Sequence, residues 1–335
     1  MKPNGQLATI RPMNAKQLVV GFFRERHDIE EFIFKGPSYQ QAYHEIIDQL
    51  NEKGVYVAIL MGQSSFKGKA HFSKHWVQVN DNGEYRFEKR GPITVDVVFE
   101  KDHFVSDGET LVLNSPQFKD MCWDKQKTYN LLGEFQPKTL VVQDETELEE
   151  ALNQMSGDKV AVKAFEGSSG HGIFVGDKAD VFGEEDLLKF PLLVQEFIET
   201  AGGVPGITDK RHDIRVVLTN GEPILATLRT PPEGGLKSNI GYGGEHRLVD
   251  IANLPTDLVE LCHRIDKKVT LLSEYRLYSA DFGLTPHGWR LFELNSMPGS
   301  INQARGKELA LYYQSKLTDF LKKVAEAGHR KVRHG

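Results

Sequence analysis

Residues 276–295, RLYSADFGLTPHGWRLFELN, constrain the fold more than any other part of the chain, because two apolar strands joined by a short turn predict a β-hairpin. Polar residues interrupt its second strand. Alternate residues of a strand share a face, so Glu293 and Asn295 point the same way. Phe292 and Leu294 then point into the opposite layer.

The turn TPHG determines which residues of the two strands face each other. A three-residue loop, residues 286–288, with its final glycine in the left-handed conformation, pairs Thr285 with Trp289. Counting back along both strands places Asp281 opposite Glu293. Directly opposite residues point to the same face, so we expect two carboxylates on one patch.

The amide oxygen of Asn295 adds to this patch. Like charges that face each other across two strands destabilise a sheet, and a hard cation resolves the conflict, because Mg²⁺ prefers oxygen ligands. A solvated polar sheet face is the alternative, although the apolar flanks disfavour it, since unpaired buried carboxylates are costly. We therefore predict Asp281, Glu293 and Asn295 as metal ligands.

Composition limits the function classes. The chain has 335 residues with a net charge of −6, which predicts two or three domains and disfavours a nucleic-acid partner. Its two cysteines, Cys122 and Cys262, give neither a disulfide framework nor a zinc spacing. We find no apolar run that spans a bilayer and no signal-peptide pattern, and we expect a cytoplasmic protein without a membrane partner.

The first part of the chain follows a strand–helix–strand pattern. Apolar strands at 17–23 and 55–62 flank an amphipathic helix at 38–54, which predicts a parallel sheet, and 91–100 is expected to add a strand. Asp124 is predicted to cap a helix at 124–135.

We predict domains at 1–120, 121–198 and 199–335. The later elements are expected as strands at 138–142, 159–165 and 191–198, helices at 145–155, 184–189, 255–273 and 307–326, and a hairpin at 213–230.

A glycine-rich loop lies within residues 160–176, VAVKAFEGSSGHGIFVG. A strand delivers Lys163, and glycines at 167, 170 and 172 then expose backbone N–H groups that suit phosphate oxygens. A strand follows instead of a helix, so the pattern is neither a Walker loop nor a dinucleotide turn. An ordinary hairpin loop with glycines is an equal alternative.

A third signal is residues 228–246, LRTPPEGGLKSNIGYGGEH. Arg229 ends a strand, and Lys237 and Asn239 lie in a long segment rich in glycine and proline. Loops this long within a compact domain tend to be functional, and cations with an amide suit an anionic intermediate. A mobile surface loop is the alternative.

Taken in order, these runs resemble the ATP-grasp superfamily, in its branch of glutathione synthetase and ribosomal-protein S6 glutamate ligases. The resemblance covers roughly residues 114–305 and implies an α/β (α+β) ATP-grasp fold. That fold has an N-terminal parallel α/β domain, a small central lid domain and a C-terminal ATP-grasp core. The matching runs are DKQKTY, VAVKAFEGSSGHGIFVG, LVQEFI, HDIRVVLTNGEPI, LRTPPEGGLKSNIGYGGE and SADFG…LFELNSMPG.

The resemblance also implies ATP with Mg²⁺ or Mn²⁺, as two ions, and assigns roles to individual residues. The family often has arginine where Lys237 stands, and a lysine cannot make the planar bidentate grip of arginine. The implied catalytic residues are Arg229, Lys163, Asn239 and Arg215. The implied nucleotide-binding residues are Lys125, Lys163, Glu166, Gly167, Ser168, Ser169, Gly170, Gly172, Gln195, Glu196, Phe197, Ile198, Glu199, Asp213 and Lys237.

The implied reaction transfers a phosphoryl group from ATP to a carboxylate, and an amine then attacks the acyl phosphate. Its partners are ATP, a carboxylate substrate and an amine acceptor, either an amino acid or a peptide; a homo-oligomer is left open. One alternative is a kinase on the same fold, which would leave a stable phosphorylated product. Another is a non-catalytic nucleotide-binding module.

Overall fold

The computed structural model describes residues 17–25, 29, 36–165, 172–184, 189–238 and 243–334. Two compact units make up the chain: residues 1–112 with 318–335, and residues 113–317. The final helix therefore contributes its C-terminal part to the first unit, whereas our sequence division assigned that part to the third domain. Within the described ranges, no helix combines the length and the apolar character needed to cross a membrane.

The first unit contains a five-stranded sheet in the order β5-β4-β2-β1-β7. As predicted, β1 pairs in parallel with β2 and with β7. The strand expected at 91–100 is split in two, because β6 pairs with β3 in a separate two-stranded sheet and β7 pairs with β1. The bounds are β1 Leu18–Arg24, α1 Pro37–Glu52, β2 Val55–Met61, β3 His71–Phe72, β4 His75–Asp81, β5 Glu84–Arg90, β6 Ile93–Thr94 and β7 Val97–Glu100.

The last helix, α6, spans Lys307–His334 and extends beyond the predicted 307–326. In the first unit its Gly328 passes so close to Asp96 that an added Cβ would lie 1.8 Å from the Asp96 carbonyl oxygen. The ring nitrogen Nδ1 of His329 lies 2.8 Å from the Asp96 carboxylate, which also accepts the backbone N–H of Val19. This close approach explains why the end of α6 belongs to the first unit.

The second unit contains two sheets, and the smaller is antiparallel throughout, in the order β10-β9-β11-β8. Its residues alternate as expected: Val160 and Val162 of β9 join an apolar core with α4, whereas Lys163 lies on the other face. The predicted helix at 184–189 overlaps residues outside the described ranges. The bounds are α2 Pro116–Trp123, α3 Lys125–Leu132, β8 Thr139–Val142, α4 Glu145–Gln154, β9 Lys159–Ala164, β10 Ile173–Asp177 and β11 Leu192–Glu196.

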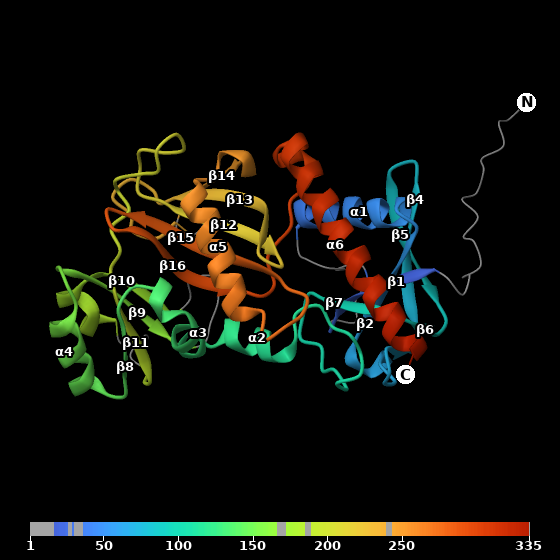
Figure 1. Ribbon diagram of the computed structural model, residues 1–335, viewed down its shortest axis with the longest axis horizontal. Helices are drawn as coiled ribbons and strands as arrows, with labels where there is room; N and C mark the ends of the chain where they lie inside the picture. Colours follow the sequence, from blue (N-terminus) through green and yellow to red (C-terminus); the bar gives the residue numbers. More distant parts are fainter. Residues whose placement is uncertain are drawn as a thin grey trace, which may run out of the picture. The chain divides into compact units, whose positions relative to one another are not determined.

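The larger sheet has the order β14-β13-β12-β15-β16, and α5 packs across one face of it (Figure 1). That face is apolar, with Ile214 and Phe282 in the core. Asn220 and Gly221 form the predicted hairpin turn, both with positive φ. The short strand β14 was not predicted. The bounds are β12 Asp213–Thr219, β13 Glu222–Thr230, β14 Glu245–Val249, α5 Thr256–Val269, β15 Leu277–Thr285 and β16 Gly288–Asn295.

The turn between β15 and β16 differs from our expectation. Thr285 pairs with Gly288, so the loop contains two residues and the predicted three-residue loop is wrong. The register then shifts at a β-bulge between Asp281 and Phe282, and Asp281 still pairs with Glu293, as predicted. The bulge contains one extra residue, Phe292. This residue makes up for the shorter loop, so that Asp281 and Glu293 still face each other.

Candidate active site

The polar face of the larger sheet carries a row of charged side chains. Asp213 pairs with Arg229 across β12 and β13, and Arg215 pairs with Asp281 across β12 and β15. Asp281 in turn pairs with Glu293. Because opposite residues share a face, the register alone gathers three carboxylates and two guanidinium groups.

Asp281 is the centre of this row. Arg215 donates to both of its carboxylate oxygens at 2.7 Å, and Nη2 of Arg229 donates to it at 2.5 Å. Arg229 also donates to Asp213, and only 6% of its surface is exposed. Nη2 of Arg215 lies 3.4 Å from Glu293, so this guanidinium group stands between the two facing carboxylates.

Burial and neighbouring charges shift the pKa values in opposite directions. Burial alone would raise the pKa of Asp281, but Arg215 and Arg229 outweigh it and hold that pKa below its usual value. Burial, together with the nearby Asp281, raises the pKa of Glu293. The Glu293 side chain is 37% exposed, so water moderates this rise. Asp281 therefore stays ionised, and Glu293 is the carboxylate that gains most from an added cation.

The donor set fits a hard cation. Within the row, three carboxylates share two guanidinium groups, and Glu293, on which the charge of Lys163 also acts, is open to the pocket. Asn295, one alternation beyond Glu293, is not among the residues that line the pocket, and its amide oxygen accepts the Met297 N–H. Within the described part of the chain, no three histidine, cysteine or carboxylate side chains could hold a metal by themselves. A metal here would need the Asn295 amide or substrate oxygens as well, which suits Mg²⁺.

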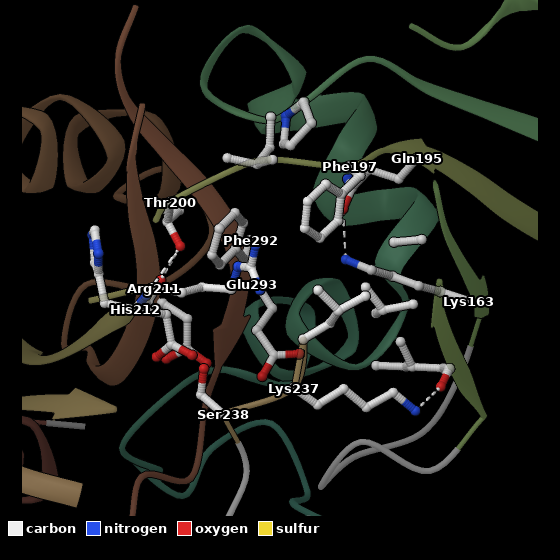
Figure 2. A pocket seen from close by; sticks show the side chains of 18 of the residues that line it. Lys163, Gln195, Phe197, Thr200, Arg211, His212, Lys237, Ser238, Phe292 and Glu293 are labelled. Atoms are coloured by element: carbon white, nitrogen blue, oxygen red, sulfur yellow. Dashed lines mark hydrogen bonds between the residues drawn. The ribbon is translucent and has the colours of Figure 1, made fainter. Parts of the chain in front are cut away.

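The smaller sheet contributes a cation to the same pocket. Figure 2 shows Lys163 and Glu293 pointing into it from different sheets. The Nζ of Lys163 donates to Oε1 of Gln195 at 2.6 Å. Burial lowers the pKa of Lys163 to about 8, and the nearby Glu293 partly opposes this effect. The lysine is charged at neutral pH and is held where an anion would meet it.

The hinge after β11 lines the pocket through Glu196, Phe197 and Ile198. The Phe197 and Phe292 rings face the same cavity (Figure 2). We had predicted that Phe292 points into the opposite layer, and this was wrong. In the bulge, two consecutive residues of β16 lie toward the pocket, and the core resumes only at Leu294.

Of three further predicted residues, Lys237 lines the pocket, whereas Glu199 and Lys125 are not among its lining residues. Both carboxylate oxygens of Glu199 accept from Arg211, at 3.0 and 2.7 Å. Lys237 lines the pocket and donates to the Ile173 carbonyl at 2.6 Å, so the long loop contacts the first residue of β10 (Figure 2). Lys125 begins α3, after the predicted cap Asp124, and its charge acts on Lys163.

Part of the glycine-rich loop can be placed. Gly172 has a φ of +69° and accepts the Ala164 N–H through its carbonyl, which closes the β9–β10 connection. The other predicted residues of this loop, and the predicted catalytic Asn239, lie outside the described residues. The residues concerned are Glu166, Gly167, Ser168, Ser169, Gly170 and Asn239.

Sequence reasoning missed several pocket residues. Phe292 could not be found from alternation, because the bulge interrupts it. Arg211 and His212 come directly before the predicted Asp213, and His212 begins the matching run HDIRVVLTNGEPI, but neither was given a role of its own. The unpredicted lining residues are Pro137, Ala161, Ile173, Val175, Thr200, Arg211, His212, Leu236, Ser238 and Phe292.

Comparison with known families decides the assignment of this site. Residues 123–311, more than half of the chain, match the RimK-like ATP-grasp domain. The chain belongs to the RimK-like ATP-grasp family. The matched segment contains every residue of the charged row and both sheets of the second unit.

Curated relatives include a probable alpha-L-glutamate ligase of Nitrosococcus oceani, 30% identical over 63% of this chain, and one of Syntrophotalea carbinolica, 29% identical over 63%. The aligned part spans 66% of each relative's length. Among solved structures, D-alanyl-alanine synthetase A of Vibrio cholerae has a TM-score of 0.60 at 15% identity, covering 93% of this chain and 98% of that one. A RimK domain ATP-grasp protein of Sphaerobacter thermophilus has a TM-score of 0.55 at 14% identity, covering 91% and 99%. These structures show the ATP-grasp fold.

Proposed function

We propose that this protein is an ATP-dependent carboxylate–amine ligase, which forms an amide through an acyl phosphate and releases ADP and phosphate. The observation that carries the proposal is the charged row of the larger sheet, of which Asp213, Arg229, Asp281 and Glu293 line the same pocket as Lys163, while Arg215 is bonded to Asp281. Phosphoryl transfer needs positioning and charge stabilisation more than covalent help from the protein, and these residues supply both.

The described thiols support a mechanism without a cysteine nucleophile. Burial raises the pKa of Cys122, and it raises the pKa of Cys262 to about 12. Neither thiol is a thiolate at neutral pH, and neither lines the pocket. This supports activation of the carboxylate substrate by phosphorylation over its transfer to a cysteine.

Each charged residue has a role in this proposal. Asp281, Glu293 and Asn295 would hold two Mg²⁺ ions, which would neutralise phosphate charge. Lys163 binds phosphate oxygens, and Arg229 faces the negative charge that develops as the amine attacks. The substrates we propose are an amino acid or short peptide on each side of the new bond, with glutamate first to be tested because of the relatives' names.

The experiment is to incubate the purified chain with ATP, Mg²⁺ and single amino acids or dipeptides, with and without hydroxylamine. A ligase releases ADP and phosphate, yields a new amide and gives a hydroxamate with hydroxylamine. A kinase accumulates a stable phosphorylated product and releases no phosphate. ADP formation without hydroxamate or amide across a broad substrate panel would refute the ligase proposal.

A further inference from the structure

The pocket face of the smaller sheet carries a hydrogen-bonded chain of three side chains. Thr139 on β8 lies directly opposite Gln195 on β11, and Lys163 on β9 is diagonal to Gln195, because its direct partner is Leu193. Thr139 and Gln195 are buried, with exposures of 6% and 5%. Three neighbouring strands therefore each contribute one member.

The hydrogen bonds that link these three side chains can run in only one direction. The Lys163 ammonium can only donate, so the Gln195 atom 2.6 Å from it must be the oxygen Oε1. Nε2 of Gln195 then donates to Oγ1 of Thr139 at 2.8 Å. The Thr139 hydroxyl donates its one proton to the Pro137 carbonyl at 2.9 Å, so its lone pair faces Gln195.

Reversing the amide would break two contacts at once. Nε2 would face the ammonium, donor against donor, and Oε1 would face a hydroxyl whose proton is already used. Leaving buried donors and acceptors unmatched costs more than the bonds themselves contribute. Thr139 and Lys163 thus favour the same orientation of the amide, in which Gln195 presents its oxygen to the lysine.

We propose that Thr139 is a positioning residue of the nucleotide site, which acts through Gln195 to hold the Lys163 ammonium in the pocket. The inference rests on the proposed function in one respect, that the pocket takes ATP. A neutral amide suits this task better than a carboxylate, because it holds the ammonium without cancelling its charge.

The test compares a ligand with phosphates and a ligand without them. Thr139→Val keeps the shape of the side chain and removes the acceptor for Gln195. We expect calorimetry with ATP and Mg²⁺ to give an affinity about fivefold to tenfold weaker, the loss of roughly one hydrogen bond. Adenosine, measured by competition, should bind equally to both proteins, because it lacks the phosphates that meet Lys163.

Two controls separate positioning from folding. Thr139→Ser keeps the hydroxyl and should restore ATP affinity. Thr285→Val removes a comparable hydroxyl at the tip of the β15–β16 hairpin. This hydroxyl donates to the Gly288 carbonyl at 2.8 Å and accepts the His287 N–H at 3.0 Å. This variant should leave both affinities unchanged. If valine unfolds β8, Thr139→Ala repeats the comparison.

The outcomes are distinct. Unchanged ATP affinity in Thr139→Val, or an equal loss for ATP and adenosine, would overturn the positioning role and leave the proposed function intact. Failure of the unaltered protein to bind ATP at all would overturn the proposed function, and the inference with it.

Discussion

Asp281 and Glu293 face each other directly across β15 and β16, although the loop that joins the strands is one residue shorter than that pairing would need in a regular ladder. The bulge at Phe292 supplies the missing residue. Its consequence is twofold: the two carboxylates meet on the polar face, and an aromatic ring is added beside them. The following predictions depend on this arrangement.

Glu293→Gln should reduce Mg²⁺-dependent turnover by roughly a hundredfold or more, about 3 kcal/mol of lost transition-state stabilisation, because Glu293 is the carboxylate most open to a cation. Calorimetric titration with Mn²⁺ in the presence of ADP should show weaker metal binding. Glu222→Gln, at the turn end of β13, is the control. Normal turnover at ordinary Mg²⁺ would remove Glu293 from the metal site.

Arg229→Lys should lower turnover about 10²–10³-fold while weakening ATP binding much less, because the arginine acts on charge that develops during the reaction. Our alternative of a mobile surface loop does not apply to Arg229, which is buried between Asp213 and Asp281. Alanine would remove the partner of Asp213 and one of the two partners of Asp281, at a cost of about 3–5 kcal/mol in stability, so lysine is the better variant.

The matched control for this prediction is Arg276→Lys. Arg276 is equally buried and pairs with Asp266 through two bonds of 2.9 and 2.6 Å. Its loss should lower the melting temperature and leave turnover intact. Equal losses of ATP affinity and turnover in Arg229→Lys would instead make Arg229 a ground-state contact of ATP.

The affinity for ATP should fall as the pH rises through about 8. Burial depresses the pKa of Lys163 from 10.5 to about 8, with Glu293, Lys125 and Asp281 as the other charges acting on it, and only the protonated form attracts phosphate. The same group destabilises the folded state when charged, a cost that disappears as the pH rises from about 8 to 10.5. Lys163→Arg stays charged and should bind ATP independently of pH in this range. A pH-independent ATP affinity in the unaltered protein would argue against Lys163 as a phosphate ligand.

Phe292→Ala should weaken nucleotide binding by about tenfold or less, in keeping with roughly 0.5–1.5 kcal/mol for an aromatic contact. Stability should change little, because Phe292 is only half-buried in the structure. Phe182→Ala, at an exposed phenylalanine, controls for loss of a ring. A large fall in melting temperature with unchanged adenosine binding would show that the ring supports the bulge and not the ligand.

Features that depend on local backbone geometry could be predicted from the amino-acid sequence. Strand alternation is a property of consecutive residues, so it placed Glu293 and Asn295 on one face without knowledge of the rest of the chain. The Asn220-Gly221 turn and the Asp124 cap were predicted for the same reason, because each depends on a few neighbouring residues. The ordered set of motifs then indicated the family, which the match over residues 123–311 confirmed.

The way in which separate strands meet could not be predicted and became visible in the folded chain. The bulge at Phe292 depends on the register between two strands, and a local pattern carries no record of it. The sharing of Asp281 by Arg215 and Arg229 requires three strands to lie side by side, as does the chain from Thr139 through Gln195 to Lys163. Such contacts join residues far apart in sequence, and their geometry is fixed by packing.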